Sequence, residues 1–191
     1  MNAARIAGFS MLAFLSACGK PLGSYQVRNV TVVTGAAVKQ IEPDLDTDPQ
    51  MLRIEFASKT DLYEASDGGG EGLYVFASFC PFQDKAPLSV SEPYYNDRPR
   101  FDPVTHENRR PAKDARTGEY VYTAYLRLRG NASVNRGGGR LNFTGYDLRR
   151  QHLDLCLRID HPGYFITPSQ SHVFSVPAGM IQHALLSAPS A

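Results

Sequence analysis

Apolar and polar residues alternate along much of this chain with the two-residue period of a β-strand. The clearest case is 120–128, in which, for example, Leu126 and Leu128 flank Arg127. Successive side chains of a strand point to opposite faces of the sheet, so the pattern predicts one face on a core and one toward solvent. Runs of this kind, bounded by turn residues, predict strands at 25–34, 52–56, 73–80, 120–128, 140–146, 153–159 and 172–176.

Seven or eight short strands with little helix predict a mostly β protein, an antiparallel β-sandwich. The run 73–80 is almost entirely apolar, which is typical of a central strand. One short C-terminal helix is predicted over 178–187, because Ile181 and Ala184 fall on one side and Pro189 ends it.

The segment 81–118 breaks the strand pattern, since it has 38 residues, six prolines and few apolar positions. Loops longer than about 15 residues are uncommon in compact domains and are often functional. Proline removes a ladder donor, so we expect this segment to be an insertion outside the sheet interior. Aromatic and guanidinium groups are enriched at binding hot spots. A solvated insertion is the alternative. If the segment binds a partner, the expected contact residues are Tyr94, Tyr95, Arg98, Arg100 and Phe101.

The start of the chain has a short apolar run, 6–15, which follows Arg5. Its last residue is the first of the tetrapeptide Leu15-Ser16-Ala17-Cys18. A membrane-spanning helix needs about 20 apolar residues, so this run predicts an export signal. The tetrapeptide resembles the lipobox of bacterial lipoproteins, and the resemblance implies cleavage before Cys18 and acylation of its thiol. An ordinary signal peptide with a chance cysteine is the alternative, but Leu15 is too large for the small residue expected there.

The resemblance also implies an organisation and a location. Residues 1–17 are the signal peptide, 18–23 the tether, and 24–191 a single domain long enough for its own core. The membrane is then a partner through the lipid on Cys18. Gly19 stands where the family often has an inner-membrane retention Asp, which implies an outer-membrane lipoprotein facing the periplasm. A single acyl chain holds a protein weakly, and family lipoproteins carry three.

Two further cysteines, Cys80 and Cys156, remain in the exported part of the chain. An even pair in an exported domain predicts a disulfide, and a closed loop of 77 residues is worth about 4–5 kcal/mol. Two buried free thiols are the alternative. Each cysteine has the opposite parity to the stronger apolar set of its strand, and Pro81 follows Cys80. We therefore expect the bridge at a strand end.

Charge is unevenly placed, although removal of Arg5 leaves a formally neutral mature chain. The segment 42–71 has nine acids and two bases, whereas 98–150 has twelve bases and five acids. Either the basic segment presents a face to anionic lipid, polysaccharide or an acidic partner, or the two segments neutralise each other. No nucleic-acid partner is expected.

Catalytic and metal-binding patterns are weak. Asp44-x-Asp46-x-Asp48 has the spacing of a calcium loop, but Pro49 occupies the position where the loop needs a glycine. His152 and Asp154 share a strand face, but no nucleophile, base and orienting group assemble in the sequence. No catalytic residue, metal or cofactor is therefore predicted.

These patterns favour a lipid-anchored envelope protein that acts as a non-catalytic interaction or assembly module, with 81–118 as its contact surface. The alternatives are a binder of an anionic small molecule or glycan, and a hydrolase with an unrecognised site.

Overall fold

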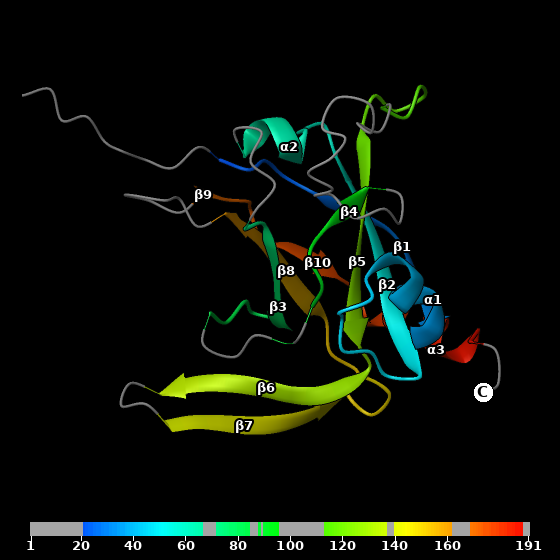
Figure 1. Cartoon of the computed structure of the whole chain (residues 1–191), viewed down its shortest axis with the longest axis vertical. Coiled ribbons are helices and arrows are strands. Elements are labelled where there is room, and N and C mark those ends of the chain that lie inside the picture. The colour runs from blue at the N-terminus through cyan, green and yellow to red at the C-terminus, as the bar shows by residue number, and fades with distance from the viewer. Residues whose placement is uncertain are drawn as a thin grey trace, which may run out of the picture.

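The computed structural model describes residues 21–66, 72–84, 88, 90–95, 113–136, 140–161 and 169–188. Within these residues the chain is mostly β, with antiparallel strand pairs and a short C-terminal helix. The predicted fold class, an antiparallel β-sandwich, is confirmed (Figure 1). The described residues form ten strands rather than seven or eight.

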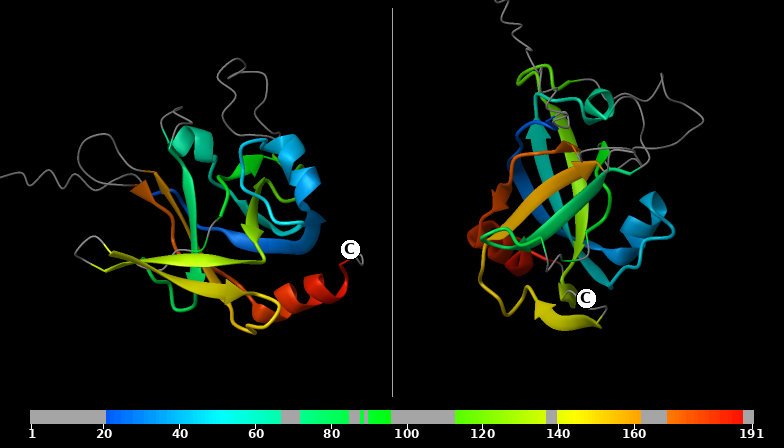
Figure 2. Two further views of the ribbon diagram at one scale, coloured as in Figure 1. Left: turned by 60° about the horizontal axis from the view of Figure 1, so that its bottom comes forward. Right: turned by 90° about the vertical axis from the view of Figure 1, so that its left-hand side faces the viewer.

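Two sheets form the sandwich. Sheet A has the order β1 (Gln26–Thr34), β2 (Gln50–Ser58), β5 (Tyr120–Arg127) and β4 (Tyr94–Tyr95). Sheet B has the order β10 (Phe174–Val176), β8 (Leu155–His161) and β3 (Tyr74–Phe79), with β9 (Ser169–Gln170) also paired to β8. Turned by 90°, the molecule shows the strands of sheet B crossing in front of those of sheet A (Figure 2).

The core lies between the inner faces of the two sheets. Ile54 and Phe56 of β2 are fully buried, and so are Leu157 and Ile159 of β8. The Phe56 ring also packs on that of Tyr122, with 5.8 Å between the centroids. Removing such apolar surface from water is the main stabilising term of a fold, so the alternating pattern of the sequence is also the pattern of the core.

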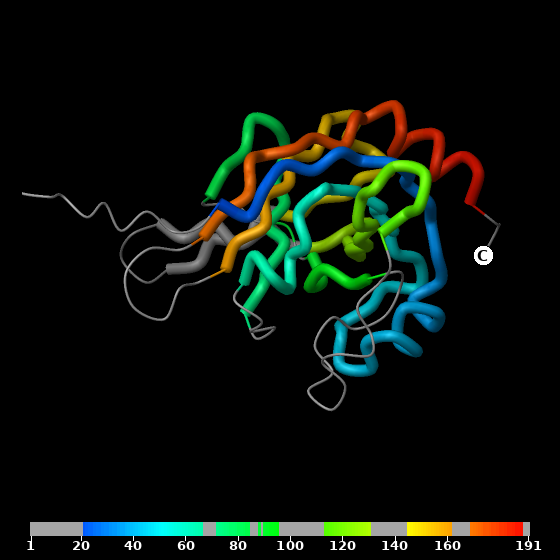
Figure 3. The backbone as a smooth tube through the Cα atoms, turned by 90° about the horizontal axis from the view of Figure 1, so that it is seen from above, coloured from blue at the N-terminus to red at the C-terminus, as the bar shows by residue number. Residues whose placement is uncertain are grey.

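Helices and a separate ribbon surround the sandwich. α1 (Gly35–Ile41), α2 (Leu62–Ala65) and α3 (Ala178–Leu186) are short, and β6 (Arg129–Arg136) pairs with β7 (Arg140–Asp147) as a two-stranded ribbon. Seen from above, α1 and α3 lie on different sides of the molecule (Figure 3).

Of the helices only α3 matches a prediction, and three strands were not predicted. β4 and β9 have two residues each, too few for a period to show. β6 has the sequence RGNASVNR, which is too polar to give an apolar alternation.

Residues 88 and 90–95 are a buried part of the domain rather than a solvated insertion, although β4 and Leu88 add to the edges of the two sheets and not to their interior. The Leu88 amide donates to the Ala77 carbonyl of β3 (2.8 Å), and the Ser91 amide donates to the Tyr125 carbonyl of β5 (2.9 Å). These residues therefore pass from sheet B to sheet A. β3 is the last strand in the order of sheet B, not a central one, and Leu88 lies along it.

The structure joins Cys80 and Cys156 in a disulfide with a Cα–Cα distance of 5.1 Å. Cys80 follows the last residue of β3, and Cys156 lies in β8, which pairs with β3. The bridge is thus at a strand end, as the parity argument predicts. None of the described helices is both long and apolar enough to cross a membrane.

Candidate functional site

Two of the five predicted contact residues are buried. Tyr94 is 2% exposed and Tyr95 7% exposed. They are neighbours in a strand, so their rings point to opposite faces of sheet A: Tyr95 packs on Tyr122 in the core, and Tyr94 packs on Tyr125 outside it. Neither side chain is free to reach a partner, so the prediction of partner contact is corrected for both. Arg98, Arg100, Phe101 and Cys18 lie outside the described residues.

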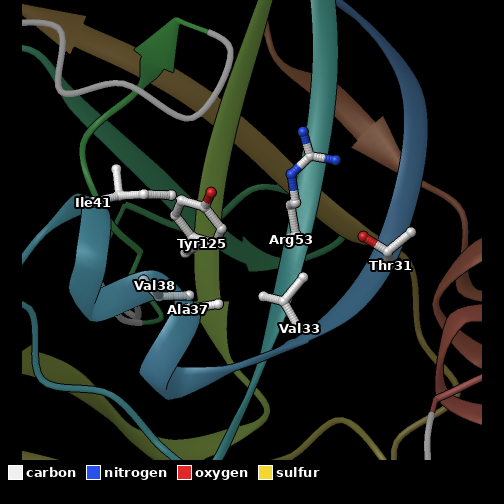
Figure 4. Close-up of a pocket in the computed structure, with 7 residues that line it drawn as sticks. All are labelled: Thr31, Val33, Ala37, Val38, Ile41, Arg53 and Tyr125. Atoms are coloured by element: carbon white, nitrogen blue, oxygen red, sulfur yellow. The ribbon is translucent and has the colours of Figure 1, made fainter.

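A groove runs along the outer face of sheet A, beside α1. Its volume is about 270 Å³. The walls are mostly apolar, and one guanidinium lies at the edge (Figure 4). The lining residues come from β1, α1, β2 and β5, and they are Thr31, Val33, Ala37, Val38, Ile41, Arg53 and Tyr125.

Local sequence explains why α1 covers this face. The Thr34 hydroxyl caps the helix by accepting the Ala37 amide (3.2 Å), as threonine commonly does. Gly35 follows, and its amide donates to the Pro49 carbonyl at 2.9 Å. A Cβ at Gly35 would lie 2.0 Å from the Asp48 carbonyl oxygen, so only glycine lets the two segments approach this closely.

A second apolar cluster supports the floor of the groove. It consists of Val38, Met51, Tyr94 and Tyr125, each at most 2% exposed. The Tyr94 hydroxyl donates to a carboxylate oxygen of Glu42, the C-cap residue of α1, at 2.6 Å. Burial, and then this hydrogen bond, raise the pKa of the Tyr94 phenol above its usual value. The protonated phenol thus ties β4 to the end of α1.

Arg53 gives the groove its polar edge. A guanidinium nitrogen of Arg53 lies 3.3 Å from the Glu55 carboxylate and 3.4 Å from the Thr123 hydroxyl. The side chains of Arg53 and Glu55 are 19% and 27% exposed. The carboxylate therefore offsets the positive charge of the guanidinium, so the groove has little net attraction for an anion.

The acidic turn before β2 is not arranged as a metal site. Arg127 of β5 forms ion pairs with Asp46 and, at 2.9 Å, with Asp48. The hydrogen bond to Asp48 raises the pKa of the guanidinium. The described residues contain no group of metal-ligating side chains. One base of the basic segment thus pairs with two acids of the acidic segment.

One polar contact was missed by sequence reasoning, because its partners are 148 residues apart. The Ser24 hydroxyl oxygen lies 2.6 Å from Nδ1 of His172. A serine nucleophile and its base make such a contact, but a third group normally orients the base. Among the described residues no hydrogen bond to the second ring nitrogen of His172 is found, and both side chains are exposed. The pair joins two chain segments rather than forming a triad.

Of His152 and Asp154, which the sequence places two residues apart, Asp154 has a structural role. Asp154 Oδ1 accepts the Ala178 amide at 2.7 Å, so this carboxylate caps the start of α3. Asp114, in an exposed turn, accepts hydrogen bonds from the Thr117 and Arg116 amides, and these bonds lower the pKa of its carboxyl group.

Comparison of the chain with protein-family models, curated protein sequences and solved structures gives no match.

Proposed function

We propose that this protein is a lipid-anchored protein of the bacterial cell envelope that acts as a non-catalytic interaction module. The observation that carries the proposal is the lipobox-like sequence Leu15-Ser16-Ala17-Cys18 directly before the folded domain. The Cys80–Cys156 disulfide supports it, because disulfides persist in oxidising compartments such as the periplasm. Gly19 after the cysteine favours the outer membrane, with the domain facing the periplasm.

The groove beside α1 is the proposed contact site for a partner protein. Its volume of about 270 Å³ lies just below the roughly 300–1,000 Å³ typical of small-molecule pockets. A groove of this size suits an apolar side chain of a partner, and Arg53 at its edge belongs to a residue type enriched at interface hot spots. An anionic small molecule fits less well, since Glu55 already offsets the charge of Arg53.

The anchor is tested by metabolic labelling with palmitate. The native protein is expected to incorporate label and to partition with membranes, whereas a Cys18→Ser form is expected to do neither. Equal partition of both forms into the aqueous phase, without label, overturns the proposed anchor.

The contact site is tested by chemical cross-linking in the source bacterium. Ala36 and Ala37 are consecutive exposed residues of α1, but only Ala37 lines the groove. We expect the native protein to give a discrete adduct, Ala37→Arg to lose it, and Ala36→Arg to keep it. Both substitutions place a cation in the same first turn of the helix, so their effects on stability are matched. An adduct that survives both changes contradicts the groove as the contact site.

A further inference from the structure

The folded domain begins at Leu22, whose side chain is fully buried. The Leu22 amide donates to the Gln170 carbonyl (3.0 Å), and the Leu22 carbonyl accepts the Tyr25 hydroxyl (2.6 Å). The His172 amide donates to the Gly23 carbonyl at 3.0 Å. These contacts attach the first described residues to one end of sheet B.

The conformation at Gly23 makes this attachment specific. Its φ is +87°, a left-handed value that favours glycine, and a Cβ there would lie 2.2 Å from the Thr60 hydroxyl oxygen. The contact between Ser24 and His172 adds a further link. Position 22 is thus fixed to the domain, and only the residues before it can act as a tether.

The tether is short whatever its conformation. Four residue steps separate Cys18 from Leu22, and a fully extended chain spans at most about 14 Å over four residues. The headgroup layer on one side of a bilayer is about 5–7 Å thick. A lipid on Cys18 therefore holds the start of the domain next to the headgroups.

From this geometry, and resting on the proposed acylation of Cys18, we infer that the end of the sandwich carrying Leu22 is a lipid-facing surface. Strand pairing shows what else lies there: Leu22 bonds Gln170 of β9, Gln170 pairs with Asp160 of β8, and Asp160 pairs with Tyr74 of β3. α3 lies at the other end of the molecule (Figures 1 and 2), so the inferred orientation turns it away from the membrane.

Tyr74 has the chemistry expected at this position. Its side chain is 45% exposed, although it is a large aromatic residue on the last strand of sheet B. Tyrosine is enriched at membrane–water interfaces, because the ring packs among headgroups while the hydroxyl stays hydrated. The inferred lipid-facing surface thus accounts for an exposed aromatic ring that the core does not use.

The test measures how close each end of the domain comes to lipid headgroups. The chain contains no tryptophan, so one introduced tryptophan is the only such fluorophore. Tyr74→Trp places it at the inferred lipid-facing end, and Leu186→Trp places it on α3, where the side chain is 87% exposed. Each lipidated protein is incorporated into phosphatidylcholine vesicles that carry a nitroxide on the headgroup, and its co-flotation with the vesicles is measured first.

We expect quenching in the Tyr74→Trp protein and none in the Leu186→Trp protein. Inserting a 20-residue Gly/Ser linker before Pro21 should abolish the quenching without affecting flotation, because such a linker spans about 25 Å on average. If both proteins float with the vesicles but their tryptophans are quenched equally, the inferred orientation is overturned and the acylation of Cys18 is not. Loss of flotation overturns the acylation of Cys18, and the orientation with it.

Discussion

Single residues fix the close approaches on which this fold depends. The Tyr122 hydroxyl accepts the Leu62 amide (2.9 Å) and donates to the Thr60 carbonyl (2.8 Å), so it holds the turn before α2 from within the core. The Tyr95 hydroxyl donates to Asp61, the N-cap of α2, at 2.5 Å. Gly35 allows α1 to turn back over sheet A. The two tyrosines act through their hydroxyl oxygens, and Gly35 acts through its lack of a Cβ atom.

Replacing Gly35 with alanine is expected to destabilise the domain. The new Cβ would overlap the Asp48 carbonyl oxygen, and overpacking of this kind costs about 1–3 kcal/mol. Gly179 of α3 is the matched control, since nothing lies within 4 Å of its Cβ position and alanine favours a helix by up to about 1 kcal/mol. Urea unfolding should show opposite shifts for the two variants. A neutral Gly35→Ala would contradict the close contact.

Among the elements, the segment 88–95 shows how part of a proline-rich stretch, 81–118, enters a core. Leu88 is 4% exposed, Ser91 3%, and both tyrosines of β4 are buried. Prolines are tolerated because the segment makes separate contacts instead of one long ladder: a bridge to β3, a bridge to β5 and then the two residues of β4. It therefore connects β3 of sheet B to β5 of sheet A.

Replacing 84–113 with a short Gly/Ser linker is expected to abolish cooperative unfolding, because it removes Leu88 and both buried tyrosines. Truncating one buried aromatic residue typically costs 3–5 kcal/mol, and a whole domain is stable by only about 5–15 kcal/mol. Thermal unfolding followed by circular dichroism is the measurement. A shorter replacement of 97–111 keeps β4 and serves as the control. Equal melting temperatures for the two variants would show that 88–95 is not part of the core.

At the scale of the whole molecule, links between residues far apart in the sequence dominate. The disulfide joins positions 76 residues apart, and Arg127 of β5 pairs with Asp48 in the turn before β2. Buried tyrosines add a third kind of link. Burial raises the pKa of Tyr122, and it raises that of Tyr146 to about 12. Stability therefore depends on both the redox state and the protonation state of the protein.

Removing the disulfide should lower the free energy of unfolding by about 2–4 kcal/mol, the range typical of native bridges, because the cross-link restricts the unfolded chain. The chain-entropy value of about 4–5 kcal/mol is an upper bound for an unstrained bridge. A Cys18→Ser background keeps the protein free of lipid, and a double Cys80→Ala, Cys156→Ala variant is compared with it in urea. Because each cysteine is replaced, no free thiol complicates the comparison. Coincident unfolding curves would contradict the predicted contribution.

Alkaline pH should destabilise the protein above about pH 10. The folded pKa of Tyr146 is above the usual phenol value of about 10, so its contribution to stability is complete below pH 10 and is lost as the pH rises through 12. Urea unfolding at stepped pH measures the decline, and phenolate absorbance reports ionisation. Tyr146→Phe should show a shallower decline. If the phenolate absorbance that is missing in Tyr146→Phe has its midpoint near pH 10 while the fold is intact, the burial effect is contradicted.

The class of fold, seven of the described strands and the C-terminal helix could be predicted from the sequence, with ends within two residues of the observed ones. Period-two alternation shows which side chains share a face, as at Leu126, and only two cysteines remained to pair after Cys18. Only the tertiary structure decided what covers each face. Tyr94 and Tyr95 look like exposed anchors in a polar segment, yet each packs on a different face of sheet A.

What can be predicted from the sequence depends on how far apart along the chain the interacting residues lie. Alternation and capping act over a few residues and can be read locally, whereas the contacts of Leu88 with β3, of Arg127 with Asp48 and of Ser24 with His172 join distant segments. Their free energy appears only after the two sheets have met. The groove beside α1 is of the same kind, because it exists only where a helix after β1 returns across β2 and β5.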